Sequence, residues 1–398
     1  MSLGIFYIKS PNKNNDPDFD ESALAFLKEV SKTMGEELYI ADEQAFAVQH
    51  THIFFVASGG SEQQFVKSFN MIEGPYYLLT RRTHNSLAAA MEILAFLQES
   101  GKKGEIIHGD TGSIGRKLAQ IVKINTVKDR LKGYRLGSTD ESTWLIASNA
   151  DPVVLKTASG MDMVHISMDE LLSEVAKNTY VDNQFTEEIK RKGYDSTETK
   201  RALGVYGAVR RLVDRYELNG ITIRCFDILQ PACISGCLAL AILNAEGIHA
   251  ACEGDNRSLI SMTVLSELTG QPVFMANPGR LYPEQQEMVF AHCVLPLNMP
   301  DRYQLTTHFE SGLGISIAAE LPLDACTVFK CRENFKEYFA QNGQIIENLH
   351  EGCMCRTQIR IRLPEQISYF TTRPIANHHM ICMGDHKALI DAFFTSYE

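Results

Sequence analysis

Short apolar runs alternate with segments of helical periodicity through the first part of the chain. Runs of strand length stand at 3–8, 53–57, 76–79 and 105–108. Helices are predicted between them, at 21–34, at 85–98 and from 114. In the first of these helices the spacing predicts one apolar face, formed by Leu24, Leu27, Val30 and Met34. Strand and helix alternating in this way are typical of βαβ units around a parallel sheet.

The alternation resumes near Lys132. Strands are predicted at 134–137, 144–147 and 163–166, followed by a long helix at 196–218. Three tighter βα repeats come next, with strands at 221–226, 249–252 and 272–275 and helices at 236–245 and 257–268. Because consecutive βα repeats place their strands side by side, we expect these three strands to be neighbours in one parallel sheet.

The pattern changes after Asn277. Alternating or β-branched runs stand at 303–308, 314–319, 325–330 and 357–363, between Gly, Pro and Asn turns, and one helix is predicted at 387–394. This pattern is typical of an antiparallel sheet. We therefore predict an α/β protein with two doubly wound parallel-sheet domains, 1–132 and 133–277, followed by a β-rich, barrel-like C-terminal domain, 278–398.

Composition and charge narrow the class of protein. Of the 398 residues 44% are hydrophobic and 22% are charged, and the net charge is −11. An acidic chain of this kind does not favour nucleic acid or an anionic membrane as a partner. No apolar run approaches the ~18 residues of a membrane span, and the N-terminus does not resemble a signal peptide, so we expect a cytoplasmic protein. All ten cysteines lie between Cys225 and Cys382 without the spacing of a disulfide framework, and we expect buried thiols.

Oxygen-bearing side chains follow the last three predicted parallel strands. They are Asp227, then Glu253 with Asp255, then Asn277. Because ligands of open parallel sheets bind at the carboxyl ends of the strands, these side chains would suit a hard divalent cation or a polyhydroxylated substrate. The alternative is that they cap the helices that follow, which we favour for Asp227.

These residues also carry a family resemblance. The segment His249-Ala-Ala-Cys-Glu253-Gly-Asp255 and the segment from Thr269 to Asn277 resemble the metal-site region of the L-fucose isomerase family, to which the L-arabinose isomerases are related. The segment Ala376-Asn377-His378 matches a third ligand-bearing stretch of that family. The resemblance covers about 221–398, so the chain is identified as a short member with a fucose isomerase-like C-terminal part.

The resemblance implies a divalent metal, expected to be Mn²⁺, held by Glu253, Asn277 and His378. Asn277 stands where the family has Asp. An amide oxygen can bind a divalent cation, but it brings no charge and cannot accept a proton. Glu253 is therefore the clear catalytic base, with Asp255 as a substitute for the missing second carboxylate.

The resulting prediction is an enzyme of carbohydrate metabolism, a metal-dependent aldose–ketose isomerase that works through an enediolate. The substrate is a small-molecule sugar, whose hydroxyl groups would be bound by His308, Glu310, Arg356 and Asn377. The resemblance also implies a homo-oligomer, a trimer or hexamer, in which the first domain of a neighbouring subunit helps close the site. Two alternatives stay open because of Asn277: a non-catalytic sugar-binding relative, and a metal-assisted epimerase or lyase acting on a sugar acid, which Arg356 would favour.

Two weaker motifs remain. The segment 109–115, Gly-Asp-Thr-Gly-Ser-Ile-Gly, stands between a strand and a helix, where a phosphate cradle would lie. Its spacing fits no phosphate-binding fingerprint, so a helix-start turn is the better interpretation. His292 and Cys293 form a weak candidate for a Cys/His nucleophile, because adjacent residues of a strand point to opposite faces.

Overall fold

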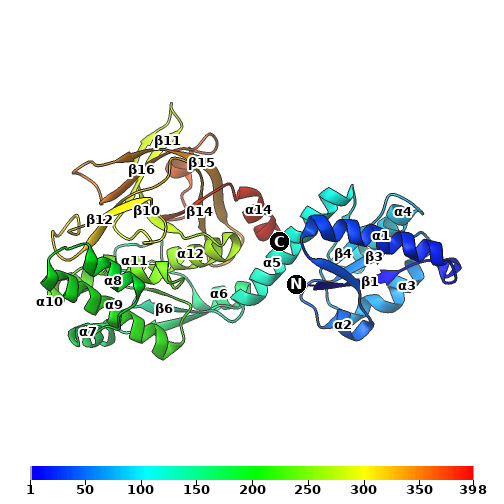
Figure 1. The fold of residues 1–398 in the computed structure, drawn as a ribbon, viewed down its shortest axis with the longest axis horizontal. Coiled ribbons are helices and arrows are strands. Elements are labelled where there is room, and N and C mark those ends of the chain that lie inside the picture. The colour runs from blue at the N-terminus through cyan, green and yellow to red at the C-terminus, as the bar shows by residue number, and fades with distance from the viewer. Residues whose placement is uncertain (1, 398) are drawn as a thin grey trace. The chain divides into compact units, whose positions relative to one another are not determined.

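The computed structural model describes residues 2–397. The chain divides into two compact units, Met1–Asp129 (unit 1) and Arg130–Glu398 (unit 2). Two parallel sheets and one closed antiparallel barrel are present, which confirms the predicted α/β class with a β-rich C-terminal part (Figure 1). Within the described residues, no helix combines the length and the apolar character that a membrane crossing requires. The division into three domains with limits at 132 and 277 stays a prediction.

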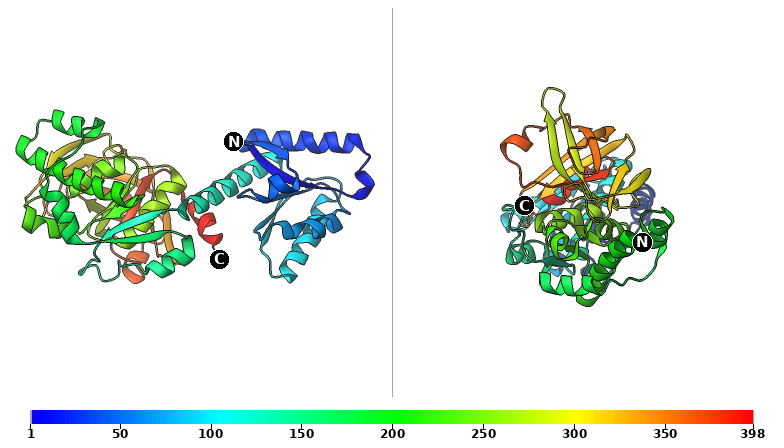
Figure 2. Two further views of the ribbon diagram at one scale, coloured as in Figure 1. Left: turned by 90° about the horizontal axis from the view of Figure 1, so that it is seen from below. Right: turned by 90° about the vertical axis from the view of Figure 1, so that its left-hand side faces the viewer.

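Unit 1 is built on a five-stranded parallel sheet of order β2-β1-β3-β4-β5. Its strands are β1 (Ser2–Ile8), β2 (Glu37–Ile40), β3 (Ile53–Val56), β4 (Tyr76–Thr80) and β5 (Gly104–Ile107). Its helices are η1 (Pro11–Lys13), α1 (Pro17–Met34), α2 (Glu43–Ala47), α3 (Glu62–Ser68), η2 (Phe69–Met71), α4 (Ser86–Glu99) and α5 (Thr111–Leu131), the last of which continues into unit 2. Helices cover both faces of the sheet (Figure 2, left). One face packs on α1 and α5 and the other on α2, α3 and α4, so the strands are buried on both sides.

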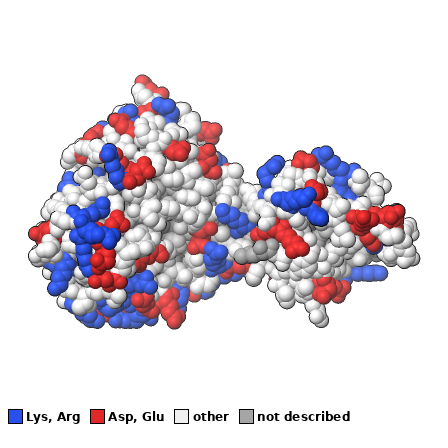
Figure 3. All heavy atoms as spheres, in the orientation of Figure 1, with Lys and Arg blue, Asp and Glu red and all other residues white. Residues whose placement is uncertain are grey.

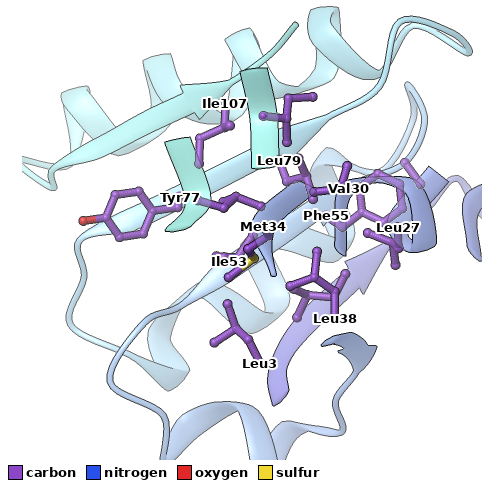
Figure 4. Close-up of a cluster of buried hydrophobic side chains, with 14 of the residues drawn as sticks. Leu3, Leu27, Val30, Met34, Leu38, Ile53, Phe55, Tyr77, Leu79 and Ile107 are labelled. Carbon is purple, nitrogen blue, oxygen red and sulfur yellow. The ribbon is translucent and has the colours of Figure 1, made fainter. Parts of the chain in front are cut away.

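Helix α1 shows how the local sequence sets its ends. The Asp16 side chain accepts a hydrogen bond from the Phe19 amide, Pro17 occupies the first turn, and Gly35 ends the helix with a φ of 79°. Its buried stripe is Phe19, Ala23, Leu27, Val30 and Met34, and part of it is visible in Figure 4. The prediction that Leu24 belongs to this stripe is wrong. Leu24 is 52% exposed, because Ala23 holds the inward position of that turn.

Unit 2 begins with a four-stranded parallel sheet of order β7-β6-β8-β9. Its strands are β6 (Arg135–Thr139), β7 (Asp162–Ile166), β8 (Gly220–Thr222) and β9 (His249–Ala251). The accompanying helices are α6 (Pro152–Ser159), α7 (Met168–Ala176), α8 (Gln184–Arg191), α9 (Ser196–Tyr216), α10 (Phe226–Ala232), α11 (Cys237–Ala245) and α12 (Asn256–Thr269). The strand predicted at 144–147 is wrong. This segment forms a turn, in which the Ser142 hydroxyl accepts from the Leu145 amide and the Leu145 carbonyl accepts from the Ser148 amide.

The rest of unit 2 is a closed antiparallel barrel, ordered β10-β11-β16-β15-β14-β17. Its strands are β10 (Phe274–Tyr282), β11 (Glu287–His292), β14 (Ala325–Cys331), β15 (Tyr338–Leu349), β16 (Thr357–Arg362) and β17 (His379–Met383). A separate ribbon pairs β12 (Arg302–Thr306) with β13 (Ser316–Glu320), and the helices are α13 (Tyr369–Thr372) and α14 (Lys387–Thr395). The predicted antiparallel runs and terminal helix are therefore confirmed.

One strand lies in a different sheet from the one expected. The apolar run at 272–275 was predicted as the third strand of the parallel sheet, but it opens β10 of the barrel. There Phe274 pairs with Ile381 of β17 and Asn277 pairs with Ala291 of β11, both antiparallel. A short buried run fits either kind of sheet, and only its distant partners decide which one forms.

Candidate metal site

Three side chains of unit 2 converge on one point. Oε1 of Glu253 lies 3.5 Å from Nε2 of His292 and 3.5 Å from Nε2 of His378. One ligand atom from each residue lies within 4.8 Å of the other two. Both Nε2 atoms are buried and have no hydrogen-bond partner in the described residues. Buried nitrogens seldom remain unpaired, and a carboxylate with two imidazoles is a common ligand set for a divalent transition metal, so these residues fit a metal ion.

The three residues lie at or beside the ends of strands from two different sheets. Glu253 follows β9 of the parallel sheet and has a φ of 63°, and Gly254 after it has a φ of 65°. A left-handed glutamate is uncommon, and such strain is concentrated at functional sites. His292 is the last residue of β11, and His378 directly precedes β17, so the barrel supplies both imidazoles. The site therefore lies where the carboxyl end of β9 meets the barrel.

Asp255 sets the orientation of His378. This carboxylate is fully buried and caps α12 by accepting hydrogen bonds from the amide and the hydroxyl of Ser258, each at 2.7 Å. Its Oδ2 also lies 2.9 Å from Nδ1 of His378, and Nζ of Lys330 lies 3.7 Å from Oδ1. A histidine that donates Nδ1–H to a carboxylate presents its Nε2 lone pair, which is the usual arrangement behind a metal ligand.

The electrostatics of the group follow from burial and close pairing. Burial alone would raise the pKa of Glu253, but the adjacent imidazoles of His292 and His378 hold it well below its usual range. Burial alone would lower the pKa of His378, but Asp255 and Glu253 outweigh it and raise this pKa to about 9. The metal-free site is thus a protonated His378 between two carboxylates. A divalent cation would take the place of that proton.

The ring of His292 is held from its other side. The backbone N–H of Cys293 donates to Nδ1 of His292 at 2.8 Å, which directs Nε2 toward Glu253. Metal binding at Nε2 would place the ring proton on Nδ1, which could then no longer accept from Cys293. The cation must therefore compensate for the loss of this hydrogen bond, worth ~1 kcal/mol. The same bond engages the backbone of Cys293 and not its thiol.

An aromatic rim borders the other oxygen of Glu253. The indole Nε1 of Trp144 lies 3.5 Å from Oε2 of Glu253. Trp144 packs edge-on against Phe226 at 5.5 Å, and Phe226 against His308 at 5.8 Å. The guanidinium of Arg224 lies 5.8 Å from the centre of the indole ring. Glu253 thus faces imidazoles with one oxygen and a partly exposed aromatic surface with the other.

The residues expected to bind sugar hydroxyls lie around this centre in two groups. Nε and Nη2 of Arg356 donate to the carbonyl and the hydroxyl of Thr307, next to the buried His308, whose Nδ1 is 2.9 Å from the Ser311 hydroxyl. Glu310 is exposed on the same loop. In the second group the Asn377 amide donates to Oδ1 of Asn277 at 2.7 Å.

The hydrogen bond between Asn377 and Asn277 connects the segments that carry His378 and His292. Asn377 precedes His378 in the chain, and Ala291, the cross-strand partner of Asn277, precedes His292.

Asp227, by contrast, lies in the first turn of α10 and pairs with Nη2 of Arg224. Of the strand-end residues, the structure brings Glu253 and Asp255 to His378.

Two residues of the site were missed by sequence reasoning. The sequence pairs His292 only with Cys293, as a weak nucleophile candidate, although His292 ends an apolar strand, where a polar residue often has a function. Trp144 was placed in a strand that does not exist. Composition alone could have drawn attention to Trp144, because it is the single tryptophan of the chain.

Comparison with known proteins bears on the chemistry of this site. No family model matches the chain. A sulfoquinovose isomerase of Alkalicoccus urumqiensis is 27% identical over 101 residues, which are 25% of this chain and 23% of that protein. A sulfoquinovose isomerase of Clostridium sp. (strain MSTE9) is 27% identical over 141 residues, which are 34% of this chain and 32% of that protein.

The chain is similar in part to sugar isomerases. The matched stretches span about a quarter to a third of the curated relatives' length. Membership of the L-fucose isomerase family stays a prediction that rests on the motifs.

Proposed function

We propose that this protein is a metal-dependent aldose–ketose isomerase. The observation that carries the proposal is the convergence of two buried imidazole nitrogens, Nε2 of His292 and Nε2 of His378, on Oε1 of Glu253, each at 3.5 Å. The partial similarity to two sulfoquinovose isomerases supports the same reaction class. The proposed substrate is therefore an open-chain sugar.

Glu253, His292 and His378 would hold the cation, expected to be Mn²⁺, with Asn277 as a further oxygen ligand in this proposal. A bound cation would supply Lewis acidity at the sugar carbonyl and would offset the negative charge that develops there. Two nitrogen ligands and one carboxylate suit a transition metal better than Mg²⁺ or Ca²⁺, which prefer oxygen.

Proton transfer is assigned to Glu253. Its low pKa keeps it ionised at neutral pH, so it can accept the proton from one sugar carbon and return it to the neighbour. Asp255 was predicted as a substitute base. Asp255 is fully buried, and its oxygens are engaged by hydrogen bonds with Ser258 and His378. We therefore assign Asp255 a positioning role behind His378. Trp144 would bring its indole N–H to the Glu253 carboxylate.

The remaining predicted residues keep their roles within the proposal. His308, Arg356 and Asn377 would bind sugar hydroxyl groups, with Glu310 at the exposed edge. A homo-oligomer, a trimer or hexamer, is proposed from the family resemblance alone, and so is a location in the cytoplasm.

Two observations favour the alternatives. Oδ1 of Asn277 accepts a hydrogen bond from the Asn377 amide. An amide cannot act as a base, which favours a sugar-binding protein without activity. Nη2 of Arg224 pairs with Asp227, but its buried Nε, beside Gly254, has no hydrogen-bond partner among the described residues, which favours an acidic sugar as substrate for an epimerase or lyase.

The test is isomerisation in deuterated water with Mn²⁺ and a panel of sugars that includes sulfoquinovose, L-fucose and L-arabinose. Deuterium should enter the product at the carbon that receives the proton. Glu253→Gln should abolish exchange, and Glu284→Gln, the same change on an exposed turn of the barrel, should leave it intact. Exchange by wild type that survives Glu253→Gln contradicts the base assignment. If wild type is silent and Asn277→Asp is active, the native protein is a binder.

A further inference from the structure

Unit 1 contains a cavity unrelated to the metal site. It opens at the carboxyl ends of β4 and β5, has a volume of about 420 Å³, and is lined mainly by the loop that joins β4 to α4. The polar and basic lining residues are Arg81, Arg82, Thr83, His84, Asn85, Ser86 and His108. Ligands of open parallel sheets bind at this edge.

The decisive residue is Arg81, a buried cation without a counter-charge. It is 5% exposed, Nε donates to the Ala57 carbonyl at 2.9 Å, and Nη1 donates to the Ser22 hydroxyl at 3.0 Å. Its guanidinium lies 4.3 Å from the centre of the Phe19 ring. Nη2 is buried and has no hydrogen-bond partner, and within 2–397 no carboxylate forms an ion pair with Arg81. A buried charge left in this state needs an anion.

The other groups around the cavity also favour an anionic ligand. Among residues 2–397 no side chain caps the N-terminus of α4, a helix of 14 residues, and Leu87 and Ala88 of its first turn line the cavity. Free amides at a helix N-terminus attract anions. Arg82 and His108 are exposed beside them, and Nδ1 of His108 lies 2.8 Å from the Thr80 hydroxyl.

The loop itself is shaped by unusual backbone. His84 and Asn85 have φ values of 59° and 54°, and the His84 ring packs on Phe19 at 4.9 Å. Burial lowers the pKa of His84, and the charges of Arg81 and Lys13 add to this, with Asp16 opposing them. Two adjacent arginines on one loop are notable in a chain of net charge −11, on whose face in Figure 3 acidic and basic side chains intermingle.

The neighbouring helix shows the contrast. The sequence offered 109–115 as a phosphate cradle at the start of α5, but there the Asp110 carboxylate accepts from the Ser113 amide at 2.8 Å and from its hydroxyl. A carboxylate already fills that position. The helix-start interpretation of this segment therefore agrees with the structure, and the available anion site is one loop away.

We propose that this cavity binds a tetrahedral oxoanion, the phosphate or sulfonate group of a small molecule. Arg81 and Arg82 of the β4–α4 loop, the first-turn amides of α4, and His108 after β5 all border the cavity, so they can meet different oxygens of one group. The proposal does not depend on the activity of the metal site.

The experiment titrates inorganic phosphate into the full-length protein and follows the backbone amides by ¹⁵N NMR. The amides of Leu87 and Ala88 should shift and saturate. Arg82→Gln should weaken binding about tenfold, as the loss of one charge-assisted hydrogen bond predicts. Lys103→Gln removes the same charge at the amino end of β5 and should bind like wild type. Both side chains are exposed, so neither change endangers folding.

Parallel titrations with methanesulfonate and with acetate define the ligand class. Tighter binding of methanesulfonate than of phosphate identifies a sulfonate as the natural group, and the reverse identifies a phosphate. Acetate binding as tightly as both overturns the tetrahedral assignment. Shifts that do not saturate in wild type, or an equal loss in Arg82→Gln and Lys103→Gln, overturn the site itself.

Discussion

Oδ2 of Asp255 lies 2.9 Å from Nδ1 of His378, although Asp255 caps α12 after the parallel sheet and His378 directly precedes β17 of the barrel. This contact decides which nitrogen His378 presents to Glu253. Asp255 also holds the N-terminus of α12 through Ser258, so the orientation of the imidazole is coupled to a helix cap.

Asp255→Asn separates these two functions. The amide can still cap α12, because Asn caps helices about as well as Asp, but it brings no charge to His378. We expect Mn²⁺ affinity to fall by ~10–100-fold, the usual cost of losing a partner behind a metal ligand. Isothermal titration calorimetry measures it. Asp16→Asn, the same change at the cap of α1, should leave affinity unchanged. Unchanged affinity in Asp255→Asn would contradict the positioning role.

His292 should contribute directly to metal binding. In wild type, Mn²⁺ at ~100 times its Kd should stabilise the fold by ~2.7 kcal/mol and raise the Tm by several degrees. His292→Ala should lose most of this shift, while His50→Ala, at a largely exposed histidine paired with Asp129, should keep it. Differential scanning calorimetry with and without chelator provides the measurement. A full Mn²⁺ shift in His292→Ala would remove this residue from the site.

Trp144 should report occupancy of the site by fluorescence. It is the single tryptophan of the chain, and its Nε1 is 3.5 Å from Oε2 of Glu253. Paramagnetic Mn²⁺ bound at Glu253 should quench its emission in a saturable way, and Glu253→Gln should weaken the quenching together with the affinity. Emission that stays constant while calorimetry shows Mn²⁺ binding would place the metal elsewhere.

Glu174 should make stability depend on pH in the acid range. It is buried, and hydrogen bonds from Arg211, Lys177 and Arg215 lower its pKa from 4.5 to about 2. A carboxylate with a lowered folded-state pKa contributes stability that is fully present above its unfolded value and is lost as the pH falls through the folded value. Glu174→Gln should therefore cost ~1–3 kcal/mol at pH 7 and progressively less from pH 4.5 to 2. Urea unfolding across this range tests it, and a pH-independent difference would contradict the assignment.

Two leucines one turn apart test the corrected stripe of α1. Leu27 is 2% exposed and Leu24 is 52% exposed. Leu27→Ala should cost ~2–5 kcal/mol of unfolding free energy, and Leu24→Ala less than ~0.5 kcal/mol. Chemical denaturation of both variants measures the difference. Equal losses would restore the original periodicity prediction.

Local chemistry let the sequence alone predict much of the fold. Helices α1, α9 and α14 were predictable because helical patterning depends on residues within a few positions of each other, although the pattern misassigned Leu24 to the buried face of α1. Strand content after Asn277 was predictable for the same reason, because alternation is a local property. The candidate residues Glu253 and His378 came from motifs, and their proximity was an expectation of the family resemblance.

Tertiary structure alone decided how distant segments pair. The run that begins β10 is apolar in any sheet, and its place in the barrel follows from partners such as Ile381, more than a hundred positions away. The same barrel closure carries His292 to Glu253 and turns the Asp255 carboxylate toward His378. In unit 1 it is packing that buries Arg81 without a counter-charge. Burial and long-range pairing depend on contacts between residues that are far apart in the chain, and a local sequence pattern does not specify those contacts.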